Sequence, residues 1–373
     1  MRFFAGLVLT LALGVIGCSG SDDGYASPEA LLINEYLDTY IEEHLTPDGP
    51  GFALAVLGPD GKVVLKRAYG MADRDEGLQI GFDTPFEVAS VSKMFTATAI
   101  LILYEDGLLE LDDPISRFFP EAPASWDEIT IHHLLTHQSG LPVSLHVGIG
   151  WTNEEVLDWY VDQPLGAEPG SEYVYNNGGY VLLALIVERA SDQAFEDFMA
   201  ERIFEPLAMQ RSQIVDSFPP EVSGAALSRL DPSVPPPDLP RRAVGFAGQY
   251  SSIDDLMRWE VELRDVTLIS PESLQLALSP LTSAPEPCGY GYGWIYCEYE
   301  GWPADEHHTG KWSGFEAIFY RAPSEGLTVV MVSNGYLEKS YRALGFNVAH
   351  LYLEGEIWKE LDEPCEGPFC EFR

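Results

Sequence analysis

The chain has 373 residues, 46% of them hydrophobic, and carries a formal net charge of −38 at pH 7. That length and apolar content allow a large buried core, in one large domain or two interleaved ones. The strongly negative charge excludes nucleic-acid binding, which requires a basic surface, and opposes adhesion to anionic lipid. Charge alone does not discriminate between small-molecule substrates.

Residues 1–17 have the pattern of an export signal. Arg2 supplies a positive start, and residues 3–16 form an apolar segment too short for a membrane span. Residues 15–18 read VIGC, which resembles a bacterial lipobox. This resemblance implies lipidation of Cys18 and anchoring to the cell envelope, facing the periplasm or the surface, with residues 18–27 as a flexible tether. The alternative is an ordinary cleaved signal peptide with an incidental cysteine.

The other four cysteines lie in two close pairs, Cys288 with Cys297 and Cys365 with Cys370. Export implies an oxidising compartment in which disulfides persist. Four cysteines allow three connectivities, of which we favour the local pairing. No histidine accompanies these pairs at ligand spacing, so the sequence predicts neither a metal site nor another cofactor.

Strand patterns occur near both ends of the chain, and helical patterns lie mainly between them. The predicted helices span 28–41, 131–137, 180–190, 252–263 and 337–353, besides one after Ser90. The predicted strands span 51–57, 62–69, 290–296, 314–321 and 327–333, with 306–312 as a candidate for another. Residues 232–242 contain five prolines and are predicted to form an irregular loop.

This order predicts an α+β fold over residues 28–358. One antiparallel sheet would be assembled from both chain ends and flanked by helices. A mostly helical insert would span about 108–283, followed by a cysteine-containing tail at 359–373. Ligands favour the cleft between two such parts.

The segment from Phe86 to Tyr104 contains the first candidate site. After Lys93 the helix is apolar on nearly every face, which predicts burial on all sides. Ser90 and Lys93 are neighbours on one helix face, because three residues separate them. A buried lysine must be paired or give up its proton, and a proton-sharing lysine can activate a serine hydroxyl. The alternative is a helix start at which Ser90 is a cap and Lys93 reaches outward.

Two later clusters offer residues that could face Ser90. A polar loop at 169–180 provides Tyr175, for proton transfer, and Asn177, for orientation. In the alternative reading, Asn177 is a helix cap and Tyr175 a half-buried aromatic residue. A glycine-containing segment at 307–314 provides His308, although a lone histidine is more often structural.

Taken in order, SVSK at 90–93, YNN at 175–177 and HTG at 308–310 resemble the three motifs of the serine β-lactamase-related hydrolases. That family includes class C β-lactamases, D-alanyl-D-alanine carboxypeptidases, D-aminopeptidases and esterases. The segments LLTHQSGLP at 134–142, GQYSS at 248–252 and YGYGW at 290–294 are also similar to the family. The resemblance covers about residues 33–353 and implies a β-lactamase/transpeptidase-like fold.

The resemblance implies hydrolysis through an acyl-enzyme on Ser90, with Lys93 and Tyr175 sharing the removal of its proton. The backbone N–H groups of Ser90 and Lys311 would hold the oxyanion. Asn177 would orient the substrate or Lys93. The remaining substrate-binding positions implied by the family are His308, Thr309 and Gly310. The implied substrates are small esters, β-lactams or peptides.

One departure from the family bears on the substrate. β-Lactamases and most penicillin-binding proteins have lysine at the position of His308, whereas histidine is mostly neutral at pH 7. In a strand, Lys311 would point away from the side of His308 and would not replace that charge. We therefore expect hydrolysis of esters or D-amino-acid-containing amides in preference to β-lactams. A penicillin-binding or sensor protein with little turnover is the alternative, and the sequence leaves the oligomeric state open.

Overall fold

A computed structural model of the chain describes residues 27–144, 147, 150–217, 222–227, 242–283, 287–335 and 341–355. The expected signal segment with Cys18, the tether up to residue 26, the Cys365 and Cys370 pair, and most of the proline-rich loop lie outside these residues. Among the described helices, none combines the length and apolar character needed to cross a membrane.

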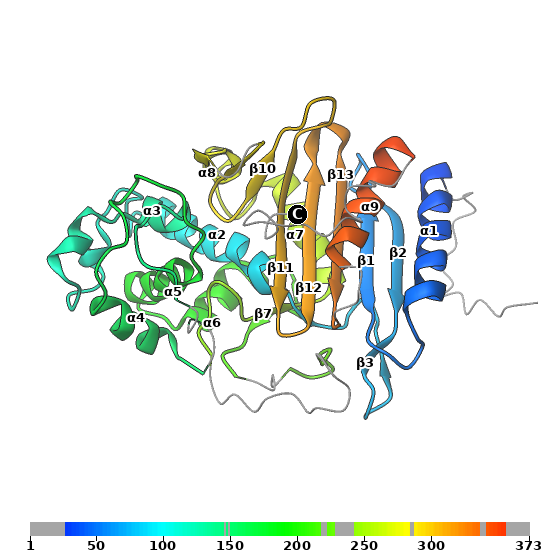
Figure 1. Cartoon of the computed structure of the whole chain (residues 1–373), viewed down its shortest axis with the longest axis horizontal. Helices are drawn as coiled ribbons and strands as arrows, with labels where there is room; N and C mark the ends of the chain where they lie inside the picture. Colours follow the sequence, from blue (N-terminus) through cyan, green and yellow to red (C-terminus); the bar gives the residue numbers. More distant parts are fainter. Residues whose placement is uncertain are drawn as a thin grey trace, which may run out of the picture.

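An antiparallel eight-stranded sheet forms the larger part of the fold, in the order β2-β1-β13-β12-β11-β10-β9-β8 (Figure 1). Its strands are β1 (Phe52–Leu57), β2 (Val63–Tyr69), β8 (Thr282–Ser283), β9 (Cys288–Tyr290), β10 (Ile295–Cys297), β11 (Asp305–Trp312), β12 (Phe315–Ala322) and β13 (Leu327–Ser333). The two chain ends meet where β1 pairs with β13, with Phe52 opposite Ser333. The prediction of one sheet built from both ends is therefore confirmed.

The central strands are buried on both faces, which explains why their sequences are almost continuously apolar. On β1, Ala53 and Ala55 belong to one core, whereas Phe52 and Leu54 belong to the core on the opposite face. Helices α1 (Pro28–His44) and α9 (Tyr341–Glu354) cover the second face (Figure 1). Helix α7 (Ile253–Asp265) packs against β1 and β13 from the first face.

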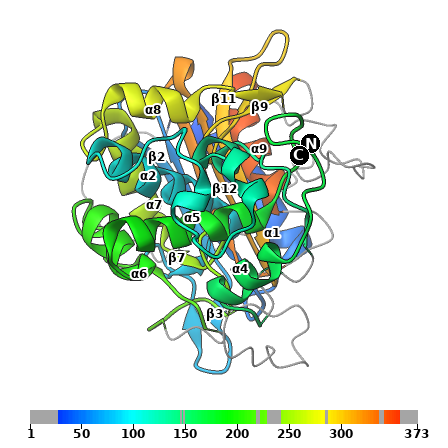
Figure 2. The ribbon, with the colours of Figure 1, turned by 90° about the vertical axis from the view of Figure 1, so that its left-hand side faces the viewer.

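The remaining helices lie mostly to one side of the sheet (Figures 1 and 2). They are α2 (Ser92–Glu105), α3 (Ile131–Leu135), α4 (Asn153–Val161), α5 (Asn177–Ser191), α6 (Phe195–Met199) with a π turn at Ala200–Phe204, and α8 (Pro271–Leu278). Short 3₁₀ segments are η1 (Ala89–Val91), η2 (Ile115–Arg117), η3 (Ala124–Glu128) and η5 (Pro323–Glu325). Helix α5 packs against α2, α3 and α4 and lies near the middle of this part.

Two small sheets complete the described structure. Strands β3 (Met71–Asp73) and β4 (Leu78–Gln79) form one, and β5 (Phe86–Glu87), β7 (Gln249–Ser251) and β6 (Gln213–Ile214) form the other. Strand β5 leads directly into η1 and α2, so the second small sheet fixes the start of the predicted Ser90 helix.

The structure corrects three predicted elements. The strand at 290–296 is split into β9 and β10, because Gly293 turns the chain at a φ of +78°. The α-helix predicted after Ser90 starts at Ser92, preceded by the 3₁₀ turn η1. Helix α3 ends at Leu135 and does not reach His137, which adopts a φ of +58°.

Candidate active site

Ser90 lies in η1, at the point where the small sheet passes into α2. The preceding residue, Ala89, has a positive φ of +49°, and its carbonyl accepts a hydrogen bond of 2.6 Å from the Ser92 hydroxyl. Left-handed backbone is unfavourable for alanine, so a sharp turn is held in place here by local bonds and packing. Ser90 is partly exposed, whereas its neighbours Ala89 and Val91 are buried.

Strand β11 runs alongside this turn. Strand β10 pairs with β11 at residues 305–307, and the following part of β11 lies against η1. A Cβ atom on Gly310 would lie 2.3 Å from the carbonyl oxygen of Val88 and 3.1 Å from the amide nitrogen of Ser90. Only glycine permits this approach, which brings the backbone of Gly310 and its neighbour Lys311 next to Ser90.

Lys93 is fully buried, as the apolar helix predicted. Its Nζ lies 3.0 Å from Oγ of Ser90 and donates hydrogen bonds of 2.9 Å to Oδ1 of Asn177 and 3.1 Å to the carbonyl oxygen of Phe246. Carbonyl oxygens can only accept hydrogen bonds, whereas a hydroxyl can also donate. A neutral lysine with two N–H groups and one lone pair therefore fits these three partners, with the lone pair directed at Ser90.

Tyr175 lies beside this group. Nζ of Lys93 is 4.8 Å from the centroid of the Tyr175 ring. The Tyr175 ring is also 6.4 Å from that of His308, so all three predicted motifs meet at one place. A serine hydroxyl, an amine and a tyrosine gathered in one place are groups that can activate a nucleophile and transfer its proton.

The adjacent asparagines Asn176 and Asn177 have separate roles. The residue that caps α5 is Asn176, whose side chain accepts from the amide of Gly178. Asn177 is the first residue of α5, and its side chain is directed to Lys93. The reading of Asn177 as a cap is therefore wrong.

His308 is buried, and both its ring nitrogens have partners. Its Nδ1 lies 2.7 Å from the carbonyl oxygen of Thr309, and its Nε2 lies 3.1 Å from the Tyr290 hydroxyl. Because a carbonyl only accepts, Nδ1 carries a proton, and a neutral ring would accept from Tyr290 at Nε2. Lys311 has a half-exposed side chain whose Nζ is 3.7 Å from the Glu316 carboxylate.

Sequence reasoning missed three contributors to this site. The first is the carbonyl of Phe246. The second is the pair of buried Arg242 and Glu87, which holds the segment around Phe246 from both sides, because the amide of Gly248 also donates to the Glu87 carboxylate at 2.8 Å. A glutamate in the apolar segment before Ser90 is the one signal that could have indicated this pair. The third is His137, whose ring centroid lies 4.4 Å from that of Tyr175.

Cys288 and Cys297 are joined by a disulfide across the β9–β10 hairpin, which also carries Tyr290. Within the described ranges, one buried group has atoms of metal-ligand type within 4.8 Å of one another: Cys297, Asp305 and His307. The Asp305 carboxylate lies 2.6 Å from Nδ1 of His307, and the sulfur of Cys297 is held in the disulfide. This oxidised group therefore offers no thiolate to a metal.

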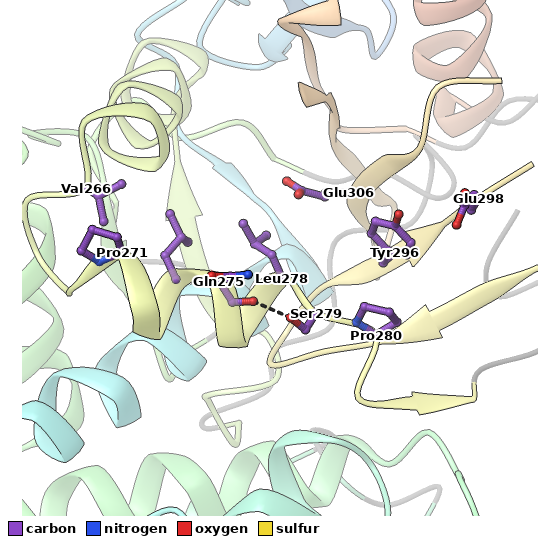
Figure 3. A pocket seen from close by; sticks show the side chains of 10 residues that line it. Val266, Pro271, Gln275, Leu278, Ser279, Pro280, Tyr296, Glu298 and Glu306 are labelled. Atoms are coloured by element: carbon purple, nitrogen blue, oxygen red, sulfur yellow. Dashed lines mark hydrogen bonds between the residues drawn. The ribbon is translucent and has the colours of Figure 1, made fainter. Parts of the chain in front are cut away.

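A surface groove of about 510 Å³ lies between α8 and the β10 region, with Pro271 and Leu278 on one wall and Tyr296, Glu298 and Glu306 on the other (Figure 3). Figure 3 also shows the hydrogen bond of 2.7 Å from Ser279 to the carbonyl of Gln275. None of the residues of the Ser90 group lines this groove. It is separate from the candidate active site.

The family model described as Beta-lactamase matches residues 37–353. Penicillin-binding protein 4* of Bacillus subtilis is 28% identical over 85% of this chain and 75% of its own length. Esterase EstB of Burkholderia gladioli is 29% identical over 83% of this chain and 92% of its own length. The structure of an octameric penicillin-binding protein homologue from Pyrococcus abyssi superposes with a TM-score of 0.74 at 26% identity, covering 87% of this chain and 77% of that one. The chain therefore belongs to the Beta-lactamase family and is a serine hydrolase of that family.

Proposed function

We propose that this protein is an exported hydrolase that cleaves esters or D-amino-acid-containing amides through an acyl-enzyme on Ser90. One observation carries the assignment of the nucleophile. Nζ of the fully buried Lys93 lies 3.0 Å from Oγ of Ser90 and also donates to two carbonyl oxygens. A buried amine held in this way shares a proton with the hydroxyl at little cost.

In the first step, Oγ of Ser90 attacks the substrate carbonyl carbon and its proton passes to the Lys93–Tyr175 pair. The negative charge that develops on the carbonyl oxygen is held by the backbone N–H groups of Ser90 and Lys311, which the close approach at Gly310 brings together. The intermediate collapses when the leaving group takes a proton from the same pair. Water then adds to the ester on Ser90 and releases the acid.

Either Lys93 or Tyr175 can be the group that first receives the proton. The neutral form of Lys93 satisfies its three partners and can accept the proton directly. If Lys93 is charged, it donates to all three partners, and the Ser90 proton must go to Tyr175. The same acyl-enzyme forms in both cases, so we assign the removal of the Ser90 proton to Lys93 and Tyr175 together.

The environment of His308 supports a preference for esters over β-lactams. Its ring is buried, with one nitrogen at a backbone carbonyl and the other at Tyr290. A neutral, fully engaged ring offers little attraction to the carboxylate of a β-lactam. The similarity to esterase EstB supports the same preference.

A second candidate is a penicillin-binding or sensor protein that acylates but turns over slowly. It is favoured by relatives that are named as penicillin-binding proteins. The two candidates differ in deacylation, so a rapid first turnover followed by a very slow steady state would support this one.

The direct test compares a p-nitrophenyl ester, nitrocefin and a D-Ala-D-Ala peptide on the purified protein without its signal segment. We expect ester turnover well above nitrocefin turnover, and a loss of at least ~10³-fold in ester kcat/KM for Ser90→Ala. Efficient nitrocefin hydrolysis would overturn the substrate preference. Unchanged ester hydrolysis by Ser90→Ala would overturn the nucleophile itself.

Export and lipid anchoring belong to the same proposal. They rest on the charged start, the apolar segment and the VIGC sequence at 15–18. Labelling of bacterial cells with a radioactive fatty acid tests them, because Cys18→Ser should abolish incorporation while leaving the protein detectable. Equal labelling of both proteins would contradict the assignment of Cys18.

A further inference from the structure

His137 contacts the ring of Tyr175 and forms hydrogen bonds with both chain neighbours of Tyr175. The amide of Val174 donates to the carbonyl oxygen of His137 at 2.9 Å, and the amide of Asn176 donates to its Nδ1 at 3.1 Å. The residues on both sides of Tyr175 are thus bound to one histidine. The His137 ring also packs on that of Tyr175, with centroids 4.4 Å apart and planes inclined by 43°.

The histidine itself is fixed in one state. It is only 2% exposed, and its backbone is held at a φ of +58°. Since Nδ1 accepts from an amide, the neutral ring carries its proton on Nε2, which has no hydrogen-bond partner among the described residues. Protonation would place a second N–H against the amide of Asn176. Burial lowers the pKa of His137 well below its ordinary value.

Leaving the buried Nε2–H without a partner is costly, so the other atoms of the ring must offset that cost. What histidine adds is a flat ring with an acceptor at Nδ1, on a backbone conformation that histidine tolerates better than most residues. All three features act on the segment that carries Tyr175.

We infer that His137 is a positioning residue that holds the phenol of Tyr175 in place for the transfer of the Ser90 proton. This inference rests on the proposed function, in which Tyr175 shares that proton with Lys93. It predicts that a change at His137 slows the acylation of Ser90 through the placement of Tyr175. Errors of about 1 Å in placement can cost ~10²-fold in rate.

Two variants separate the contributions of His137. His137→Asn keeps an oxygen acceptor near the position of Nδ1 and tolerates a positive φ, whereas His137→Phe keeps the ring and removes the acceptor. His350→Asn is the matched control, because His350 is also buried and its ring packs on that of Trp302, on the α9 face of the sheet.

The deciding experiment is a double-mutant cycle between His137→Phe and Tyr175→Phe. The readout is the rate constant of the p-nitrophenol burst, alongside the free energy of unfolding of each protein. We expect His137→Phe to slow the burst about 100-fold in the wild-type background and less than about 2-fold in the Tyr175→Phe background. His137→Asn should stay close to the wild-type rate, and His350→Asn should lose stability without slowing the burst.

An equal loss in both backgrounds would overturn the inference, as would a burst in His137→Phe at the wild-type rate. If His137→Phe does not fold, His137→Ala takes its place in the same cycle and the same criteria apply. A wild-type protein that shows no burst and no labelling of Ser90 would instead overturn the proposed function. The two failures are therefore distinguishable.

Discussion

Oδ1 of Asn177 lies 2.9 Å from Nζ of Lys93, although the two residues are 84 positions apart in the chain. Its neighbour Asn176 is directed elsewhere: its side chain accepts from the Tyr160 hydroxyl and donates to the carbonyls of Leu141 and Pro142. The two adjacent asparagines thus have different functions at the start of α5. Asn177 orients the amine of Lys93, and Asn176 holds the loop at Leu141 and Pro142.

This division predicts opposite effects for two neighbouring substitutions. Asn176→Ala should lower the free energy of unfolding by about 2–3 kcal/mol, because it removes a helix cap and leaves buried groups unpaired. Asn177→Ala should cost less than about 1 kcal/mol of stability but lower ester kcat/KM by ~10²-fold, because Lys93 loses an acceptor. Denaturant unfolding and steady-state kinetics on both proteins check this. The reverse pattern would show that Asn177 is structural.

Lys93→Met is predicted to separate activity from stability. The substitution removes the amine while keeping an unbranched side chain in the buried helix, so ester kcat/KM should fall by at least ~10³-fold. Stability should stay equal or rise, because a buried amine costs free energy. Lys62→Ala, at a lysine whose side chain is 81% exposed, is the control and should change neither quantity. A large loss of stability in Lys93→Met would indicate a structural role for this lysine.

Gly310→Ala tests the contact between β11 and the Ser90 turn. The added Cβ would meet the Val88 carbonyl at 2.3 Å, and neither backbone can move without displacing the Ser90 amide. We expect a fall of ~10²-fold or more in the rate of Ser90 acylation. Gly166→Ala is the matched control, since its added Cβ would lie 3.7 Å from the nearest atom, the carbonyl oxygen of Gly140. Acylation of Gly310→Ala at the wild-type rate would contradict the proposed oxyanion site.

The stability of the protein should depend on pH through His350. Burial lowers the pKa of this histidine from 6.5 to about 4. The unfolded chain therefore binds a proton that the folded protein rejects between pH 6.5 and pH 4, so this contribution to stability is complete above pH 6.5 and is lost as the pH falls through that range. His350→Asn should show a weaker decrease in the free energy of unfolding between pH 7 and pH 4.5 than the wild type. Parallel curves for the two proteins would contradict the assignment.

Much of this site could be predicted from the sequence, because it depends on side chains in apolar surroundings. The burial of Lys93 follows from the uniformly apolar helix around it, and the sheet follows from strand patterns at both chain ends. The orientation of Lys311 away from His308 follows from the two-residue period of a strand.

Other features could not be read in advance. The acceptor at Phe246 is a backbone carbonyl, which leaves no mark in the choice of side chain. Which of the two adjacent asparagines caps α5 depends on whether the helix begins at residue 177 or at residue 178, a difference of one residue. The division of β9 from β10, in contrast, was predictable: glycines at 291 and 293 interrupt the predicted strand, and a glycine within a strand often marks a bend.

The central claim is that Ser90 is the nucleophile and that Lys93 makes it reactive. The most direct test is mass spectrometry of the intact protein and its peptides after reaction with a fluorophosphonate probe, for the wild type, Ser90→Ala and Lys93→Met. We predict one adduct per wild-type chain, located at Ser90, none in Ser90→Ala and greatly slowed labelling in Lys93→Met. A folded wild-type protein that stays unlabelled, or one labelled at another residue, would contradict the claim.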